Sequence, residues 1–572
     1  MGKLISRRTL LGNGIKTSIA LIAFRNARTV VASARETDGN AKLQPAFQRL
    51  DEFIARHMNE TGAPGMILAL ADRKGLLREC QYGFADVKSQ LKVSPQTLFE
   101  IGSISKSFVA LAILQLVDES KLDLYKPVQS YLPWLKIETE FKPITTHHLL
   151  SHTAGLSGIP LLNRVASTTL RTGSEPGTQF LYSNIGYNLL GFLIEAVDQR
   201  PFAESLQVRV LDLLGMNSTA PVITSAIRRQ LAVGYAPLQD DRPFPSRGVL
   251  GEAPWVEVSE AAGSVAATAK DMSAYLQVLL NRGVGPRGRV ISEQSFKLLT
   301  KPVIKAPFRG EESNYGYGLW TSEVNGHRLL RHTGGMVAFS SAMYADISDG
   351  FAAFASVNAN LRGYRPVAVT RYALDVLSSV SHEKDLPALP PAQPVPTQVK
   401  NAADYAGVYT SPTGAKLMLS NQGEQLILEH KNRHITLEQV GRDRFIVKDP
   451  DFELFVLGFG REKDQVVEAF HGADWWTNER YTGPKSFDFP KDWKTYTGRY
   501  KSDSPWYGST RLLIRKGRLL IDGEQPLLQI SSGVFRPEGG STADRIVFDS
   551  AMNGKASHFN YSGIDFYRIY IP

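Results

Sequence analysis

Ser103-Ile104-Ser105-Lys106 begins the segment that decides the fold of this chain, because the strongest helical pattern in the sequence follows it directly. Residues three positions apart share one face of a helix, so Lys106 can reach the Ser103 hydroxyl. A helix start also supplies free backbone N–H groups and a positive potential, which suit an oxyanion and lower the pKa of a nearby lysine. The segment therefore predicts a serine nucleophile with a lysine base. The apolar residues that recur at helical spacing up to Asp118 are Phe108, Leu111, Leu114, Leu116 and Val117.

The spacing S-x-x-K is weak when it stands alone, since Ser89-Gln90-Leu91-Lys92 fits it as well. That second match lies in a polar segment with no helical pattern behind it. Only Ser103 has a predicted helix to orient its hydroxyl, so we interpret Ser103 as the nucleophile.

Tyr182-Ser183-Asn184 is the second candidate element, and it lies between a turn rich in glycine and proline and another helical pattern. A tyrosine there can share a proton with Lys106, and an asparagine can hold a substrate amide. The three residues alone fit a structural interpretation equally well, with Tyr182 as a half-buried aromatic residue and Asn184 as the N-cap of the helix.

His332-Thr333-Gly334-Gly335 is the third candidate element, and it ends a predicted strand over residues 328–331 that pairs with residues 315–322. Small residues here let a substrate backbone lie along the strand edge as an added strand. The structural alternative is a glycine turn after an edge strand.

Taken in this order, the three elements resemble the signature of the serine β-lactamase and penicillin-binding-protein superfamily, which is S-x-x-K, Y-x-N and K/H-T-G. Gly102 and the stretches 121–134 and 148–156 match as well, and the resemblance covers residues 40–380. It implies an acylated Ser103 with Lys106 and Tyr182 as the general base and acid. The further site residues that it implies are His332 beside the catalytic protons, Asn184, Thr333 and Gly334 as substrate contacts, and the N–H groups of Ser103 and Gly335 as the oxyanion hole.

The chain departs from many β-lactamases at His332, where those enzymes carry a lysine. A lysine cation suits a substrate carboxylate, whereas histidine is mostly neutral at pH 7, so an efficient β-lactamase is a weaker expectation. The D-aminopeptidase and D-Ala-D-Ala carboxypeptidase branch of the superfamily is favoured, because it resembles this chain in combining a histidine third element with appended β-barrels. An esterase, a weak β-lactamase and a penicillin-binding sensor that deacylates slowly stay open as alternatives.

The order of the predicted elements favours an α/β (α+β) fold for residues 35–384, with an antiparallel sheet flanked by helices and an all-helical subdomain. Five prolines mark a linker at residues 385–399. Beyond the linker Tyr405-Ala-Gly-Val-Tyr409 recurs as Tyr496-Thr-Gly-Arg-Tyr500, each followed by short strand patterns. We therefore expect two small antiparallel β-barrels of the lipocalin-like kind, at residues 400–487 and 488–572.

Residues 1–34 are typical of a twin-arginine-type export signal, with Arg7-Arg8, an apolar run and Ala32-Ser33-Ala34 as the cleavage site. A periplasmic or secreted protein without a stable membrane span is expected. The formal charge of +9 becomes 9 − 6 = +3 without this segment, which does not suggest a nucleic-acid partner. The six cations removed are Lys3, Arg7, Arg8, Lys16, Arg25 and Arg28.

No cofactor or metal is expected. Cys80 is the only cysteine, which excludes an internal disulfide and a cysteine-based zinc site. His148 and His152 lie four residues apart but without the glutamate of the zinc-protease pattern, so a structural role is favoured. The expected partner is a small-molecule or short peptide substrate.

Overall fold

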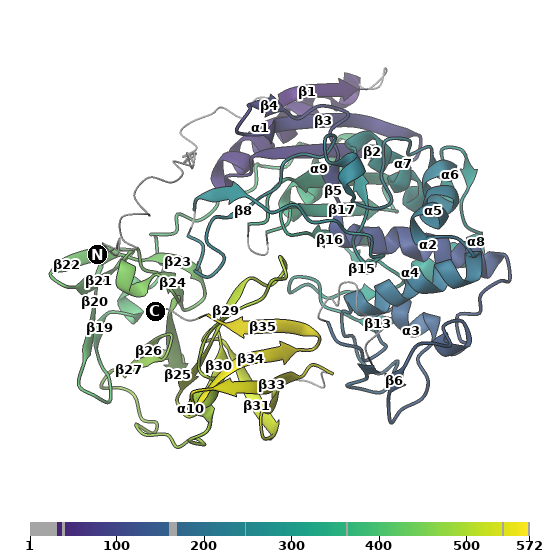
Figure 1. Ribbon diagram of the computed structural model, residues 1–572. Coiled ribbons are helices and arrows are strands. Elements are labelled where there is room, and N and C mark those ends of the chain that lie inside the picture. Colours follow the sequence, from purple (N-terminus) through teal and green to yellow (C-terminus); the bar gives the residue numbers. More distant parts are fainter. Residues whose placement is uncertain are drawn as a thin grey trace, which may run out of the picture.

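The computed structural model describes residues 31–36, 41–158, 169–245, 248–361, 364–539 and 543–569 (Figure 1). The predicted export signal lies outside the described residues except for its last four residues, which belong to strand β1 (Val31–Glu36). In the part of the chain that is described, no helix is long and apolar enough to cross a membrane.

A ten-stranded antiparallel sheet forms the centre of the region before the linker. Strands β2 and β18, from the two ends of this region, pair from Met66 to Asp72 of β2, which fits the predicted antiparallel sheet. Strand β4 (Leu91–Lys92) pairs with β3 at the side of the sheet. The others, in spatial order, are β1, β3 (Gly75–Asp86), β2 (Gly65–Asp72), β18 (Phe351–Val357), β17 (Ser340–Asp346), β16 (His327–Gly335), β15 (Trp320–Val324), β14 (Asn314–Tyr315) and β13 (Ile304–Lys305).

Helices cover both faces of this sheet. Successive side chains of the central strand β2 point to opposite faces, and they are buried against helices on each face. Leu68 packs in one core with helices α1 and α9, whereas Ile67 and Ala69 pack in a larger core with α2 and α7. The helices are α1 (Gln44–Thr61), α2 (Ser105–Asp118), α3 (Thr146–Leu150), α4 (Asn184–Asp198), α5 (Phe202–Leu206), α6 (Asp212–Leu214), α7 (Ala269–Leu280), α8 (Glu293–Leu299) and α9 (Val367–Ser381).

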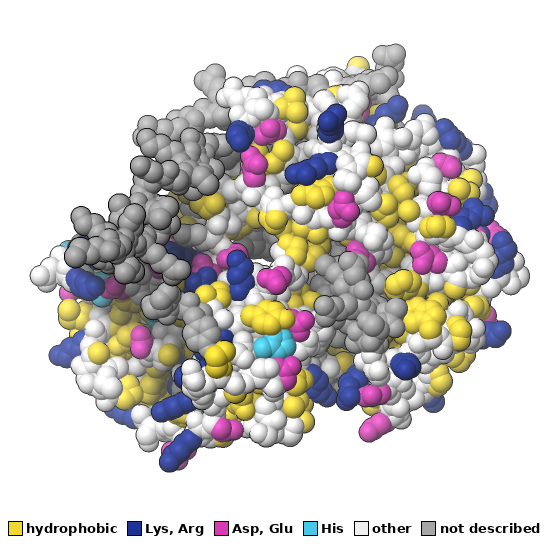
Figure 2. All heavy atoms as spheres, viewed as in Figure 1, with side chains coloured by type: hydrophobic (Ala, Val, Ile, Leu, Met, Phe, Trp, Pro, Cys, Tyr) yellow, Lys and Arg dark blue, Asp and Glu magenta, His cyan; other side chains and the backbone are white. Residues whose placement is uncertain are grey.

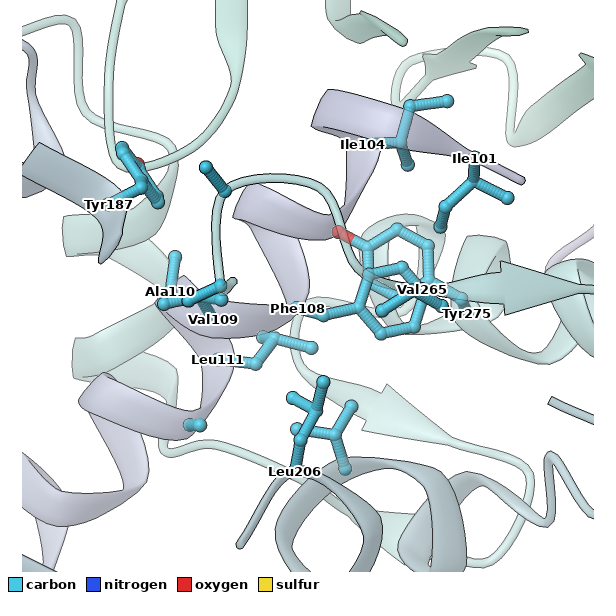
Figure 3. Close-up of a cluster of buried hydrophobic side chains, with 14 of the residues drawn as sticks. Ile101, Ile104, Phe108, Val109, Ala110, Leu111, Tyr187, Leu206, Val265 and Tyr275 are labelled. Carbon is cyan, nitrogen blue, oxygen red and sulfur yellow. The ribbon is translucent and has the colours of Figure 1, made fainter. Parts of the chain in front are cut away.

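Helix α2 lies inside the molecule and not on its surface. Every residue from Ser105 to Leu116 is buried, so the helix packs on all sides and not only along the apolar face that the sequence pattern indicates. Figure 3 shows Phe108 of α2 stacked on Tyr275 of α7, with ring centroids 4.1 Å apart. Close packing around the whole helix fixes the position of its start, which carries Lys106, and of the 3-10 turn just before it (Gly102–Ile104), which carries Ser103.

The region after the linker forms two antiparallel β domains where two barrels were predicted: the second is a closed eight-stranded barrel, and the first is a nine-stranded sheet that is not fully closed. The repeated motif has the same place in both, since the Tyr409 hydroxyl donates to the Tyr405 carbonyl at 2.9 Å and the Tyr500 hydroxyl to the Tyr496 carbonyl at 2.8 Å. The open sheet holds β19 (Gly407–Thr410), β20 (Lys416–Gln422), β21 (Gln425–His430), β22 (Arg433–Thr436), β23 (Glu438–Gly441), β24 (Arg444–Ile446), β25 (Leu457–Glu462), β26 (Gln465–His471) and β27 (Asp474–Thr477). Helix α10 (Trp493–Tyr496) precedes the barrel of β28 (Gly498–Lys501), β29 (Ser509–Arg515), β30 (Arg518–Ile521), β31 (Gln525–Ser531), β32 (Val534–Pro537), β33 (Ile546–Met552), β34 (Lys555–Tyr561) and β35 (Ile564–Arg568).

The closed barrel lies against the first region. Asp241 pairs with both Arg499 and Arg511 of the barrel, each at 2.8 Å, and Trp506 packs against the large core that contains α2. The linker is also held, because the Tyr372 hydroxyl of α9 donates to the Pro387 carbonyl at 3.1 Å. Figure 2 shows the face hollowed where the first region meets the C-terminal units, with side chains of both charges around the hollow.

Candidate active site

Lys106 is buried at the start of α2 and makes three polar contacts. Its Nζ lies 3.0 Å from Ser103 Oγ, 2.8 Å from Asn184 Oδ1 and 2.7 Å from the Ala262 carbonyl oxygen. Burial lowers the pKa of Lys106 well below its usual value. The oxygens of Asn184 and Ala262 only accept, so a neutral amine gives them its two N–H groups and directs its lone pair at the Ser103 hydroxyl.

Ala262 reaches Lys106 because two short strands pair behind the nucleophile. These strands are β5 (Phe99–Glu100) and β10 (Ala266–Ala267). Next to them, the Ile101 N–H donates to the Val265 carbonyl at 3.0 Å, and the Val265 N–H donates to Ser105 Oγ at 3.1 Å. Sequence reasoning missed Ala262, since a backbone carbonyl leaves no residue-type signal.

Tyr182 lies beside the nucleophile: its hydroxyl interacts with Ser103, and its ring centroid lies 4.9 Å from Lys106 Nζ. Burial raises the pKa of Tyr182, so its hydroxyl keeps its proton at neutral pH and is a donor. The N-cap interpretation of Asn184 is wrong: Ser183 caps α4, because its Oγ accepts the Gly186 N–H at 3.1 Å. Asn184 is thereby free to contact Lys106.

His152 positions the segment that carries Tyr182. Its Nδ1 accepts the Ser183 N–H at 3.0 Å, and its ring centroid lies 4.2 Å from that of Tyr182. His148 Nδ1 accepts the Thr145 N–H at 3.1 Å and closes a capping box at the start of α3. Both contacts support the predicted structural role of the two histidines.

His332 is buried in β16 with both ring nitrogens occupied. Nδ1 lies 2.7 Å from the Thr333 carbonyl and must donate to it, so Nε2 accepts from the Tyr315 hydroxyl at 3.2 Å. Burial lowers the pKa of His332 to about 3, and the ring is neutral. The ring centroids of His332 and Tyr182 lie 6.5 Å apart. The predicted catalytic role of His332 stays a prediction.

Strand β16 continues through the third element, which corrects the expectation that the strand ends at Arg331. Its pairing with β17 runs to Gly335, but β15 pairs with it only as far as Arg331. The segment His332–Gly335, with Thr333 and Gly334 inside it, therefore has one edge without a strand partner in the described chain. Such an edge can hold an extended substrate backbone.

Glycine is required where this edge meets the nucleophile. Gly102 has φ +54°, and a Cβ on it would lie 2.8 Å from the Gly335 backbone nitrogen. A Cβ at Gly334 would overlap the Ile101 carbonyl. This close approach brings the N–H of Gly335 beside Ser103, where the oxyanion hole is predicted.

A cavity of about 80 Å³ opens at Ser103 and Gly335. Among its lining residues, sequence reasoning missed the polar and aromatic side chains of Asn188, Glu260 and Trp506. Asn188 lies one helical turn beyond Asn184, a spacing that could have found it, and its Oδ1 accepts the Ala262 N–H at 3.1 Å. Glu260 and Trp506 belong to no motif or periodic pattern, so the sequence did not indicate them.

Arg365 is another residue that sequence reasoning missed. Its guanidinium lies so close to Gly335 that a Cβ there would overlap it, and it donates to Ser340 Oγ at 3.3 Å. Burial lowers the pKa of Arg365, which forms no ion pair with any described residue. It places a cation next to the segment where many β-lactamases have a lysine.

The neutral His332 makes folding depend on pH. Its pKa is about 3 in the folded protein against 6.5 unfolded, so its stabilising contribution is complete above pH 6.5 and is lost as the pH falls towards 3. We expect His332 alone to lower the free energy of unfolding by about 2 kcal/mol between pH 7 and pH 5. Urea titrations at the two pH values measure this, and in His332→Gln the pH 7 to pH 5 difference should shrink by that amount. An unchanged difference would contradict the assignment.

Comparison with known proteins identifies a family model and several relatives that this chain matches. A family model described as Beta-lactamase matches residues 50–377. Protein flp of Staphylococcus aureus (strain NCTC 8325 / PS 47) is 26% identical over 328 residues, which are 55% of this chain and 63% of that protein. A beta-lactamase of Providencia stuartii is 28% identical over 263 residues, 45% of this chain and 65% of the relative. The match thus spans less than two thirds of either relative.

Among solved structures, the octameric penicillin-binding protein homologue from Pyrococcus abyssi has a TM-score of 0.53 and 22% identity. The similarity covers 76% of this chain and 100% of that one. At this identity the likeness concerns the fold.

Proposed function

The chain belongs to the beta-lactamase family, and from this premise we propose that it is a serine hydrolase that cleaves small peptides or amides through an acyl-enzyme, in the manner of D-amino-acid peptidases. The observation that carries the proposal is the contact set of Lys106. When Lys106 is neutral, Asn184 Oδ1 and the Ala262 carbonyl take its two N–H groups, and its lone pair is left for the Ser103 hydroxyl.

In the first step Lys106 takes the proton of Ser103, and Oγ bonds to the carbonyl carbon of the substrate. The charge on the carbonyl oxygen is held by the N–H groups of Ser103 and Gly335. Tyr182 then donates its proton to the leaving nitrogen as the C–N bond breaks, and Lys106 returns a proton to Tyr182. Water attacks the acyl-enzyme with the same groups acting in reverse, which restores Ser103.

A peptide or amide is favoured over a simple ester by the open edge of His332–Gly335. An extended backbone offers both N–H and carbonyl groups to such an edge, whereas a simple ester has no N–H to donate. Asn184 and Thr333 are the proposed further contacts of the substrate.

Arg365 favours a second candidate, a weak β-lactamase or a slowly deacylating penicillin-binding protein. Both bind substrates with a carboxylate, and an arginine guanidinium matches a carboxylate in a bidentate pair. Arg365 supplies next to Gly335 the cation that the neutral His332 does not.

A substrate panel tests these proposals: D- and L-alanine p-nitroanilide, p-nitrophenyl butyrate and a chromogenic cephalosporin. We expect the highest kcat/KM for a D-aminoacyl anilide. A preference for the ester would replace the peptidase by an esterase, and a preference for the cephalosporin by a β-lactamase. Mass spectrometry after incubation with a penicillin completes the panel, because a persistent acyl adduct identifies the slow sensor.

We also propose export, since Arg7-Arg8 followed by an apolar run and Ala32-Ser33-Ala34 is the pattern of a twin-arginine-type signal. A periplasmic or secreted hydrolase follows. N-terminal sequencing of protein from the culture medium or periplasm should begin at residue 35, whereas an intact residue 1 would contradict the signal.

A further inference from the structure

The cavity at Ser103 contains one charged lining residue among the described residues, and it is the carboxylate of Glu260. This half-buried side chain forms no ion pair with a described residue, and it accepts a hydrogen bond from the Ser259 N–H at 3.1 Å. Burial raises the pKa of Glu260. A carboxylate that is partly removed from water without a cation is costly, so its presence beside a nucleophile points to a cationic ligand.

The two amide oxygens that line the cavity already accept hydrogen bonds from the protein. Asn184 Oδ1 accepts from Lys106, and Asn188 Oδ1 accepts from the Ala262 N–H. The Glu260 carboxylate therefore remains as the strong acceptor for a donor that enters from outside.

Trp506 forms a further part of the wall, and it comes from the closed barrel. It follows β28 in the segment before β29 and packs against the core of the first region. The face of a tryptophan ring attracts a cation by about 0.5–2 kcal/mol. A carboxylate and an indole in one small cavity are the two groups that recognise an ammonium ion.

We propose that Glu260 and Trp506 form an ammonium subsite, which selects substrates with a free amino group on the acyl side of the scissile bond. The inference rests on the proposed hydrolase and names its substrate class: amino-acid amides and peptides with an unblocked N-terminus. The acyl side follows from the geometry, because Tyr182, the proton donor to the leaving group, does not line this cavity. The acyl part, bonded to Ser103, remains inside it.

The subsite also gives the closed barrel a role in selectivity. Asp241 holds the barrel through Arg499 and Arg511 at 2.8 Å each, which fixes the wall that carries Trp506. Recognition of the amine thus needs both regions of the chain, whereas the proton transfers of Ser103, Lys106 and Tyr182 need only the first.

The direct test is Glu260→Gln, which removes the charge and keeps the size. We expect kcat/KM for D-alanine p-nitroanilide to fall on the order of 10- to 100-fold, mainly through KM. Hydrolysis of p-nitrophenyl butyrate, which has no amine, should change less than about twofold, since no charged contact is lost. The matched control is Glu252→Gln, because Glu252 is an exposed acid in the neighbouring cavity that does not include Ser103. Equal losses on both substrates, or none, would overturn the subsite.

A binding measurement separates the subsite from the proposed function, because it needs no turnover. Calorimetry with Ser103→Ala should detect D-alaninamide and not N-acetyl-D-alaninamide, and adding Glu260→Gln or Trp506→Leu should weaken the binding. If this pattern holds while no aminoacyl substrate is cleaved, the peptidase proposal fails and the subsite stands. If both compounds bind alike in all variants, the subsite is wrong whatever the enzyme cleaves.

Discussion

Replacing Ser103 with alanine is expected to abolish hydrolysis, with kcat falling by about 10⁴- to 10⁶-fold on every substrate of the panel. The loss is this large because Ser103 forms the covalent bond, and no other group in the site can take its place. Ser103 is half-buried while the residues around it are buried, so its hydroxyl is the part of this turn that a substrate can reach.

Ser89→Ala is the matched control, since Ser89 begins the other S-x-x-K segment. Its hydroxyl donates to Asp86 at 2.6 Å, and Lys92 of the same segment is exposed in β4. Full activity is expected in this variant. Retained activity in Ser103→Ala, measured by kcat on p-nitrophenyl butyrate and D-alanine p-nitroanilide, would refute the mechanism.

Lys106→Arg is expected to lower kcat by about 10³-fold or more, although the positive charge is kept. Arginine does not give up a proton near neutral pH, so it cannot accept the proton of Ser103. The larger guanidinium group also does not fit the site, because Lys106 is buried and its Nζ already contacts Ser103, Asn184 and Ala262 within 3.0 Å.

Two further variants show whether the loss in Lys106→Arg is chemical. Lys106→Met approximates the lysine chain and removes the amine, and it should be as inactive as Lys106→Arg while thermal unfolding checks that it folds. Lys121→Arg should be fully active, because Lys121 is exposed and pairs with Glu119 at 2.7 Å. Near-normal turnover in Lys106→Arg would make Lys106 a structural cation and leave Tyr182 as the next candidate base.

Much of the fold could be predicted because its signals are local. The helical pattern after Ser103 predicted a helix up to Asp118, and the structure has α2 there. The proline-rich segment and the repeated tyrosine motif indicated the change to β structure after residue 385. The prediction was less accurate where packing decides: α2 is buried on all sides, and β16 runs past Arg331 to Gly335 because β17 pairs with it that far.

By itself the sequence determined that Ser103 and Lys106 meet, because side chains three positions apart in a helical segment lie on the same face. The tertiary structure decided which groups surround them. Asn184 and the Ala262 carbonyl contact Lys106 across 78 and 156 residues of chain, and they set the direction of its lone pair. Glu260 and Trp506 line the cavity from separate regions. The physical reason is that contacts between distant segments depend on how helices, strands and barrel pack together, and a single carboxylate, indole or backbone carbonyl leaves no periodic trace in the sequence.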